Sequence, residues 1–196
     1  TSPEYTFNKR QSAPDHVLIV VIDALRPDTV PELDLDFTRA IAPGTWTFPS
    51  VTSINSGLYP HEHNAVAHTS TDDTEYAMPE QADPQYTLPK TLESAGFATY
   101  GGFSFMTPFL ALQSWFQKNK VYRDVEAQKV VSHYRDWRSG RDQTFGYLHL
   151  GDLHAPINPP QQNVEEYEVD TAIDGIRRLE RFTSGYNGSE ECKKFR

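Results

Sequence analysis

The hydrophobic positions of the chain fall into apolar runs separated by segments with helical spacing. Residues 16–22, HVLIVVI, form a continuous β-branched run, which predicts a strand buried on both faces of a parallel sheet. The segments FATYGG at 97–102 and TFGYLHL at 144–150 predict further strands. Strands that alternate with helices indicate an α/β fold with a mostly parallel central sheet flanked by helices.

The segments between the predicted strands carry helix signals. In TFPSVTSINSG, Pro49 fits the first turn of a helix and Gly57 fits its end. Two further segments also end at a glycine, which predicts a helix in each. A third segment has acidic residues near its start and arginines near its end, as the helix dipole prefers, and this predicts another helix. These helices are expected at 87–96, 124–140 and 163–182.

The remaining segments complete the domain organisation. Residues 1–15 are polar and predict an N-terminal arm, and residues 16–196 predict one α/β domain. Residues 65–88 are acidic and have no periodicity, so they predict a long surface loop that helps to shape a substrate entrance.

Composition excludes some classes of function. The net charge of -9 argues against nucleic-acid binding, which requires clustered basic residues. With 27 acidic residues and seven lysines, the composition is typical of proteins from salt-loving organisms, and an ordinary acidic protein is the alternative.

Two absences in the sequence bear on location. No apolar run approaches the roughly 18 residues that cross a bilayer, so no membrane segment is expected. The single cysteine, Cys192, excludes an internal disulfide and fits a reducing compartment. We therefore predict a cytoplasmic protein, and the sequence leaves its oligomeric state open.

Three residues stand where a parallel sheet collects its ligands, at the carboxyl ends of strands. Asp23 follows the first strand, His154 follows the strand at 144–150, and Thr47 begins a helix whose N–H groups favour an anion. Together they predict a centre in which Asp23 binds a divalent cation, Thr47 is the nucleophile and His154 contacts an anionic ester. The structural alternatives are two helix caps and a turn residue.

A longer stretch carries a family resemblance. TFPSVTSINSGLYPHEHN at 47–64 resembles the sulfatase signature, in which C-x-P-S-R is followed by T-G-x-Y-P-x-x-H. VIDALRPD, TLPKTLESAGFATYGG and LHLGDLHAPINPP are similar to other segments of the same family, in the same order. The sulfatase-like family belongs to the alkaline phosphatase superfamily of metal-dependent hydrolases and transferases. The resemblance therefore implies an alkaline-phosphatase-like sandwich and a small sulfate or phosphate ester as substrate.

Carried over residue by residue, the resemblance implies the same three roles. Asp23 would be a metal ligand, Thr47 would be both the nucleophile and a metal ligand, and His154 would contact oxygens of the ester. The metal would be Zn, Mn, Ca or Mg. Arg26 and Asp28 match the family pattern, and we expect them to hold the loop in place.

The chain departs from the sulfatase pattern at the nucleophile. Sulfatases place Cys or Ser, which becomes formylglycine, and then Arg, where this chain has Thr47 and Val51. The segment GGFSFMTPF also lacks the Lys and His of the family's G-K-x-H element. Threonine is the nucleophile expected in phosphodiesterases, phosphonate hydrolases and phosphoglycerol transferases of the superfamily. Phosphate esters are therefore favoured over sulfate esters.

A further departure concerns the other metal ligands. The family takes them from a later D-H or D-N pair, and no such pair follows residue 183. We therefore expect the second half of the metal site, and the end of the fold, to be absent from this sequence. The alternative function is a non-catalytic or fragmentary module of the same fold that binds an anion or a metal.

Overall fold

The computed structural model describes residues 14–26, 38, 40–66, 68–69, 76–77, 79–122 and 126–154. The strands are β1 (His16–Ile22), β2 (His68–Thr69), β3 (Tyr76–Ala77), β4 (Ala98–Phe103), β5 (Lys118–Val121) and β6 (Thr144–Leu150). The helices are α1 (Thr47–Ser56), α2 (Pro60–His63), α3 (Leu88–Ser94), α4 (Met106–Leu112) and α5 (Ala127–Arg138). The predicted helix at 163–182 and most of the predicted arm lie outside the described residues.

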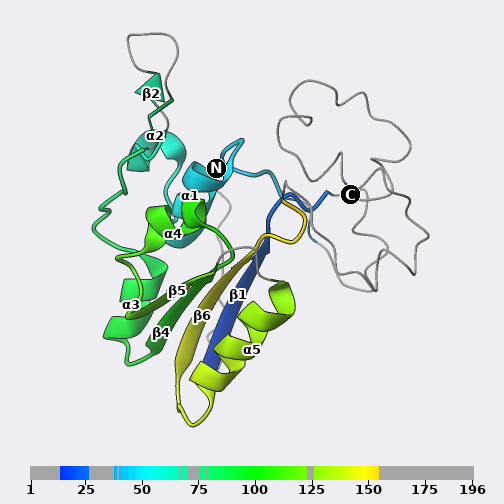
Figure 1. Cartoon of the computed structure of the whole chain (residues 1–196). Coiled ribbons are helices and arrows are strands. Elements are labelled where there is room, and N and C mark those ends of the chain that lie inside the picture. Colours follow the sequence, from blue (N-terminus) through cyan, green and yellow to red (C-terminus); the bar gives the residue numbers. More distant parts are fainter. Residues whose placement is uncertain are drawn as a thin grey trace, which may run out of the picture.

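Four strands form one parallel sheet in the order β1-β6-β4-β5 (Figure 1). β1 pairs with β6 along its whole length, from His16 beside Thr144 to Ile22 beside Leu150. All four strands therefore end at the same edge, which brings the residues that follow β1 and β6 close together. The predicted α/β fold with a parallel sheet is confirmed.

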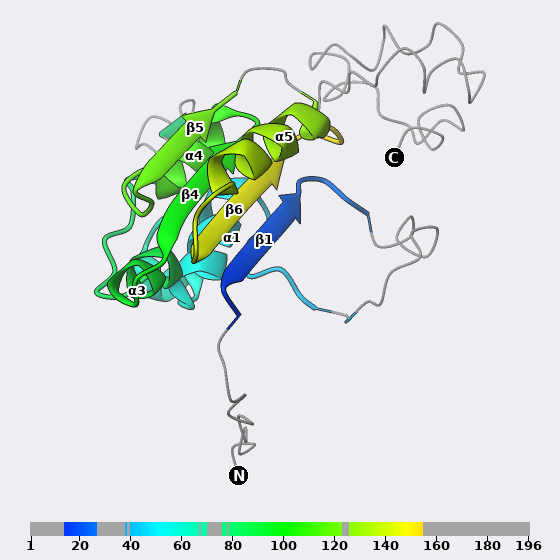
Figure 2. The ribbon, with the colours of Figure 1, turned by 90° about the horizontal axis from the view of Figure 1, so that it is seen from below.

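Helices cover the two faces of this sheet unequally (Figure 2). α1 and α4 pack against each other on one face, and α5 packs on β6 and β4 on the other. Alternate residues of β6 separate accordingly, because side chains of a strand point to opposite faces in turn. Phe145 and Tyr147 belong to the core under α1 and α4, and Leu148 and Leu150 belong to the core under α5.

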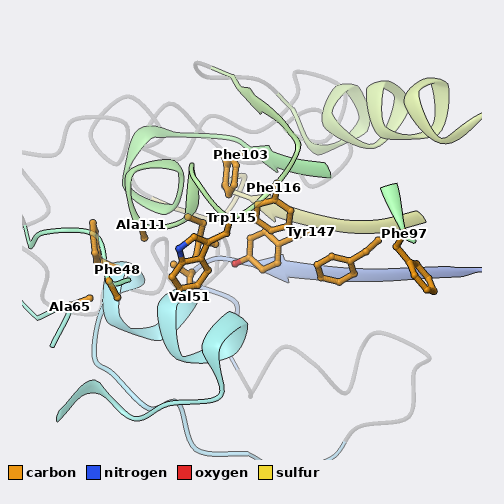
Figure 3. Packing of buried hydrophobic residues seen from close by; sticks show 12 residues of the cluster. Phe48, Val51, Ala65, Phe97, Phe103, Ala111, Trp115, Phe116 and Tyr147 are labelled. Atoms are coloured by element: carbon orange, nitrogen blue, oxygen red, sulfur yellow. The ribbon is translucent and has the colours of Figure 1, made fainter. Parts of the chain in front are cut away.

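The larger core is aromatic. Phe48 and Val51 of α1 face Tyr147 of β6 across a cluster that includes Trp115 and Phe116 (Figure 3). These five side chains are each no more than 6% exposed. Because each large aromatic side chain buries an extensive apolar area, this cluster anchors the start of α1 to the sheet.

The prediction that residues 16–22 are buried on both faces is wrong within the described residues. Val17, Ile19 and Val21 pack against the core under α1. The alternate residues are Leu18, Val20 and Ile22, and they are 46%, 45% and 40% exposed. The reason is topological: β1 is at the edge of the four-stranded sheet, and α5 lies over its neighbours β6 and β4 rather than over β1.

Several elements were not predicted from the sequence. α2 and α4 contain only four and seven residues, and β5 is the polar segment KNKV. Such short segments carry too few positions for a period to be recognised. The predicted loop at 65–88 contains the small antiparallel pair β2 and β3 and the start of α3. Its role at a substrate entrance stays a prediction.

Candidate active site

Asp23 lies directly beyond β1, at the carboxyl edge of the sheet. Its backbone N–H donates to the carbonyl of Leu150 at 2.9 Å, which extends the pairing of β1 and β6 by one residue. The next residue, Ala24, has φ 60°, a left-handed conformation that is costly for a residue with a side chain. The chain therefore turns sharply just after the carboxylate has been placed.

Thr47 meets this carboxylate from the other side. It is the first residue of α1, and its Oγ1 donates to Asp23 Oδ2 at 2.9 Å. The N-cap residue of α1 is Trp46, which makes no side-chain capping hydrogen bond. The structural alternative, in which Thr47 caps the helix, is therefore wrong: its hydroxyl is directed at Asp23.

A third residue of the site was missed by the sequence analysis. His149 of β6 places its Nε2 at 2.9 Å from the same Oδ2 of Asp23. An ionised carboxylate only accepts hydrogen bonds, so Nε2 carries a proton and donates. The other ring nitrogen, Nδ1, lies 3.2 Å from the hydroxyl of Tyr147. His149 is 1% exposed, so it is a buried residue that links Tyr147 of the core to Asp23 by hydrogen bonds.

The strand register explains why His149 reaches Asp23. His149 pairs with Val21 in the strand register, and Asp23 comes two residues after Val21 on that neighbouring strand. His149 lies on the face of the sheet that α1 covers. A signal was present in the sequence, because a histidine in an otherwise apolar strand requires a hydrogen-bond partner when it is buried. The sequence-based prediction assigned a functional role only to His154, which follows the strand.

The electrostatics of the site favour a charged carboxylate. Burial opposes the ionisation of Asp23, but the hydrogen bond and charge of His149, followed by the hydrogen bond from Thr47, hold its pKa below the ordinary value. Burial raises the pKa of Tyr147, so this residue remains a neutral phenol. A negative charge therefore stands at the start of α1, beside a hydroxyl.

His154 lies in the turn that follows β6. Its backbone N–H donates to the carbonyl of Gly151 at 2.9 Å, and its ring centroid is 4.8 Å from that of Phe105. Phe105 also contacts His149 edge-on, with centroids 5.4 Å apart. His154 is close enough for its charge to lower the pKa of Asp23. The structure thus places all three predicted residues at one edge of the sheet.

Other positions of the signature have structural roles. Val51, where sulfatases have Arg, is 2% exposed in the core. Gly57 ends α1 in the left-handed conformation, with φ 72°. His63 is buried against α1, bonded to Ser53 Oγ at 3.0 Å and to the backbone N–H of Ala65 at 3.0 Å. His63 is therefore a buried residue that ties the segment after α2 to α1.

The donors at this edge fit part of a metal site. Thr47 Oγ1 and Asp23 Oδ2 lie 2.9 Å apart, and oxygen ligands suit hard divalent cations. No group of three His, Cys, Asp or Glu residues that could hold a metal occurs among the described residues. Arg26 belongs to the described part of the chain, whereas Asp28, the other matching residue of that segment, lies outside it.

Fold and site together define an α/β protein whose candidate centre lies at the carboxyl edge of a parallel sheet. A family model described as Sulfatase matches residues 17–189 of the sequence. The chain therefore belongs to the sulfatase family. A comparison with curated protein sequences gives no match.

Two solved structures have the same fold. The C-terminal periplasmic domain of EcEptC from Escherichia coli, in complex with Zn, is 13% identical with a TM-score of 0.51. The match covers 82% of this chain and 49% of that chain. Murine ectonucleotide pyrophosphatase/phosphodiesterase 5, in an inactive threonine-to-alanine form in complex with AMP, is 15% identical with a TM-score of 0.50. That match covers 87% of this chain and 50% of the murine one.

The chain thus spans about half the length of these two solved structures. The alkaline-phosphatase-like architecture is confirmed for the part that the chain contains. No described helix is both long and apolar enough to pass through a bilayer. The Escherichia coli relative is a periplasmic domain, and the cytoplasmic location of this chain stays a prediction.

Proposed function

We propose that this chain is the part of a metal-dependent phosphoester hydrolase or transferase that contains the nucleophile. Thr47 is the nucleophile, Asp23 and Thr47 are ligands of a divalent cation, and His154 contacts the oxygens of the ester. The observation that supports this assignment is the 2.9 Å hydrogen bond from Thr47 Oγ1 to Asp23 Oδ2 at the start of α1.

The chemistry of the residues gives each a defined task. The oxygen of Thr47 attacks phosphorus in line, the bond from phosphorus to the leaving oxygen breaks, and a phosphothreonine forms. Asp23 Oδ2 is the acceptor nearest to the proton that Thr47 loses. The N–H groups at the start of α1 favour the negative charge of the ester. Water or an acceptor alcohol then releases the phosphoryl group from Thr47.

A divalent cation, when bound, would neutralise charge on the ester and lower the pKa of the Thr47 hydroxyl. The EcEptC structure was determined with Zn, which makes Zn one of the ions to test. The inactive form of the murine relative has alanine in place of a threonine, as expected if threonine is the nucleophile in this fold. Phosphate esters are favoured over sulfate because Thr47 cannot become formylglycine.

His149 is proposed as the residue that positions Asp23. Its Nε2 and Thr47 Oγ1 both donate to Oδ2, so the orientation of the carboxylate is set by two bonds from two different elements. Such partners of a metal ligand orient it and typically change metal affinity or activity by about 10–100-fold when replaced.

The test is the hydrolysis of three p-nitrophenyl esters, the phosphomonoester, the phosphodiester and the sulfate. Each is measured with Mn²⁺, Zn²⁺, Ca²⁺ and Mg²⁺, at low and at high salt because of the acidic composition. Thr47→Ala should abolish metal-dependent turnover, whereas Thr47→Ser, which keeps a hydroxyl, should retain part of it. Rapid acid quench and peptide mass spectrometry should find a phosphoryl group on Thr47.

Two results would contradict the proposal. Equal turnover by the wild type and Thr47→Ala would exclude Thr47 as nucleophile. Metal binding without turnover of any ester would instead support the alternative, a module that binds a metal or an anion without catalysis.

A further inference from the structure

An aromatic ring lies beside the two histidines of the candidate site. Phe105 is the N-cap residue of α4 and comes two residues after the end of β4. The N–H of Ser104 donates to the carbonyl of His149 at 3.0 Å, so the pairing of β4 with β6 continues to the residue before Phe105. This pairing brings the ring of Phe105 next to His149 and to the turn that follows β6.

The ring contacts the two histidines in different ways. It meets His149 edge-on, with ring centroids 5.4 Å apart and an interplanar angle of 81°. It packs against His154 with centroids 4.8 Å apart and an interplanar angle of 35°. His149 is already oriented by hydrogen bonds at both ring nitrogens, to Asp23 and to Tyr147. His154 belongs to a turn, where no strand pairing fixes the chain, so the contact with Phe105 has its main effect there.

The turn that carries His154 packs on the same ring. The carbonyl of its first residue, Gly151, accepts a hydrogen bond from the N–H of His154 at 2.9 Å. A Cβ at Gly151 would lie 3.0 Å from Cδ1 and 3.2 Å from Cε1 of Phe105, which is close enough to force the ring to shift. The absence of a side chain at Gly151 therefore lets the ring lie directly against the backbone of the turn. Phe105 thus contacts both ends of the turn from Gly151 to His154.

We infer that Phe105 is a positioning residue, whose ring holds the imidazole of His154 at the edge of the sheet where Asp23 and Thr47 meet. The inference rests on the proposed function, because His154 is proposed there to contact the ester. Phe105 belongs to GGFSFMTPF, the segment that lacks the Lys and His of the sulfatase G-K-x-H element. In this chain the segment supports a histidine that comes from the turn after β6.

The first test is steady-state kinetics on the preferred ester, with the cation that supports turnover. Phe105→Leu keeps an apolar side chain but removes the flat ring, and it should raise KM by about tenfold, because a small misplacement of a substrate contact is costly. The same variant should keep kcat and metal affinity within a few-fold, since Phe105 does not contact Thr47 or Asp23 in the described structure. Phe105→Tyr keeps the ring and should restore the KM of the wild type.

The matched control is Phe109→Leu. Phe109 is also in α4, and its ring packs edge-on against Phe103 with centroids 5.8 Å apart. Its removal should leave KM unchanged. A loss of metal affinity in Phe105→Leu with unchanged KM would overturn the inference, because it would assign the role of the ring to His149.

A double-mutant cycle tests whether Phe105 acts through His154. In a His154→Ala background, Phe105→Leu should raise KM no further, because the side chain that it positions is already absent. The same rise in both backgrounds would overturn the inference. Gly151→Ala displaces the ring without removing it and should raise KM in the wild-type background alone.

A measurement that does not depend on turnover is the NMR spectrum of histidine-labelled protein, with His154 assigned by comparison with His154→Asn. The ring-proton resonances of His154 should shift in Phe105→Leu and remain in place in Phe105→Tyr and Phe109→Leu. Unchanged resonances in Phe105→Leu would overturn the inference whether or not an ester is hydrolysed. Shifted resonances in a protein that hydrolyses no ester would support the contact and contradict the proposed function instead.

Discussion

Two aspartates follow neighbouring strands of this protein, and they have different partners. Asp23 follows β1 and accepts a hydrogen bond from the side chain of Thr47, at the start of α1. Asp152 follows β6 and accepts one from the backbone N–H of Ala127, at the start of α5, at 2.9 Å. Both tie the beginning of a helix to the same edge of the sheet, on opposite faces.

The two aspartates differ in the group that donates a hydrogen bond to the carboxylate. Asp152 satisfies a backbone donor of the first turn of α5, which is an ordinary structural cap. Asp23 instead accepts hydrogen bonds from the hydroxyl of Thr47, the proposed nucleophile, and from the buried His149. An aspartate after a strand is therefore not by itself a sign of function. Its partner decides whether it stabilises the fold or prepares chemistry.

The largest effect is expected from removing the charge of each aspartate. Asp23→Asn should reduce metal-dependent turnover by about 10³-fold or more, because the amide is a poor ligand for a divalent cation and a poor proton acceptor. Asp152→Asn, the matched control, keeps an oxygen for Ala127 and should retain turnover within a few-fold. Steady-state kinetics on the preferred ester measures both, and similar losses in the two variants would remove the distinction.

A smaller effect separates the two nitrogens of His149. His149→Gln can keep a donor near the position of Nε2 and therefore the bond to Asp23, whereas His149→Asn keeps only the side toward Tyr147. We expect His149→Asn to weaken metal affinity and kcat by about 10–100-fold and His149→Gln to recover much of this loss. Metal titration by calorimetry measures the affinity, and steady-state kinetics separates the effect on kcat from the effect on KM. The same loss in both variants would indicate that His149 has a packing role alone.

The structural role of Asp152 predicts a loss of stability without a loss of chemistry. Asp152→Ala removes the acceptor for the N–H of Ala127 and should lower the free energy of unfolding by about 1 kcal/mol. Asp152→Asn should lose less than half of this. Urea denaturation followed by circular dichroism measures both, and an alanine variant as stable as the wild type would show that the hydrogen bond contributes nothing.

The last effect appears only as the pH is lowered and concerns His63, a buried histidine with no carboxylate among its hydrogen-bond partners. Burial lowers its pKa below the ordinary 6.5. The unfolded chain therefore binds the proton first as pH falls, so the stabilising contribution is complete above about pH 6.5 and is lost below it, by at most ~1.4 kcal/mol per pH unit.

His63→Asn provides the control, because its side-chain oxygen can still accept from the N–H of Ala65 and does not titrate. The difference in unfolding free energy between wild type and variant should change between pH 7 and pH 5 in the direction of a less stable wild type. A difference that is constant with pH would show that His63 has the same pKa in both states.

The regular elements could be predicted where a strong local pattern exists. The apolar run of β1 and the Pro49 and Gly57 signals of α1 predicted both elements almost to the residue. β5 could not be predicted, since KNKV is polar and becomes a strand only because β4 offers it a hydrogen-bonding edge. The exposure of one face of β1 could not be predicted either, because it depends on where α5 lies.

The sequence by itself determined the parallel α/β fold, the family, and the two residues Asp23 and Thr47 as candidates, because strand periodicity, helix-end signals and motif spacing are local. Only the tertiary structure decided that His149 braces Asp23 and that Asp152 caps α5 instead. These outcomes depend on two hydrogen bonds whose partners are 126 and 25 residues apart along the chain, one between two side chains and one from a backbone N–H to a side chain. Such bonds form only after the packing of the sheet and helices has set the direction of each side chain to within a few tenths of an ångström.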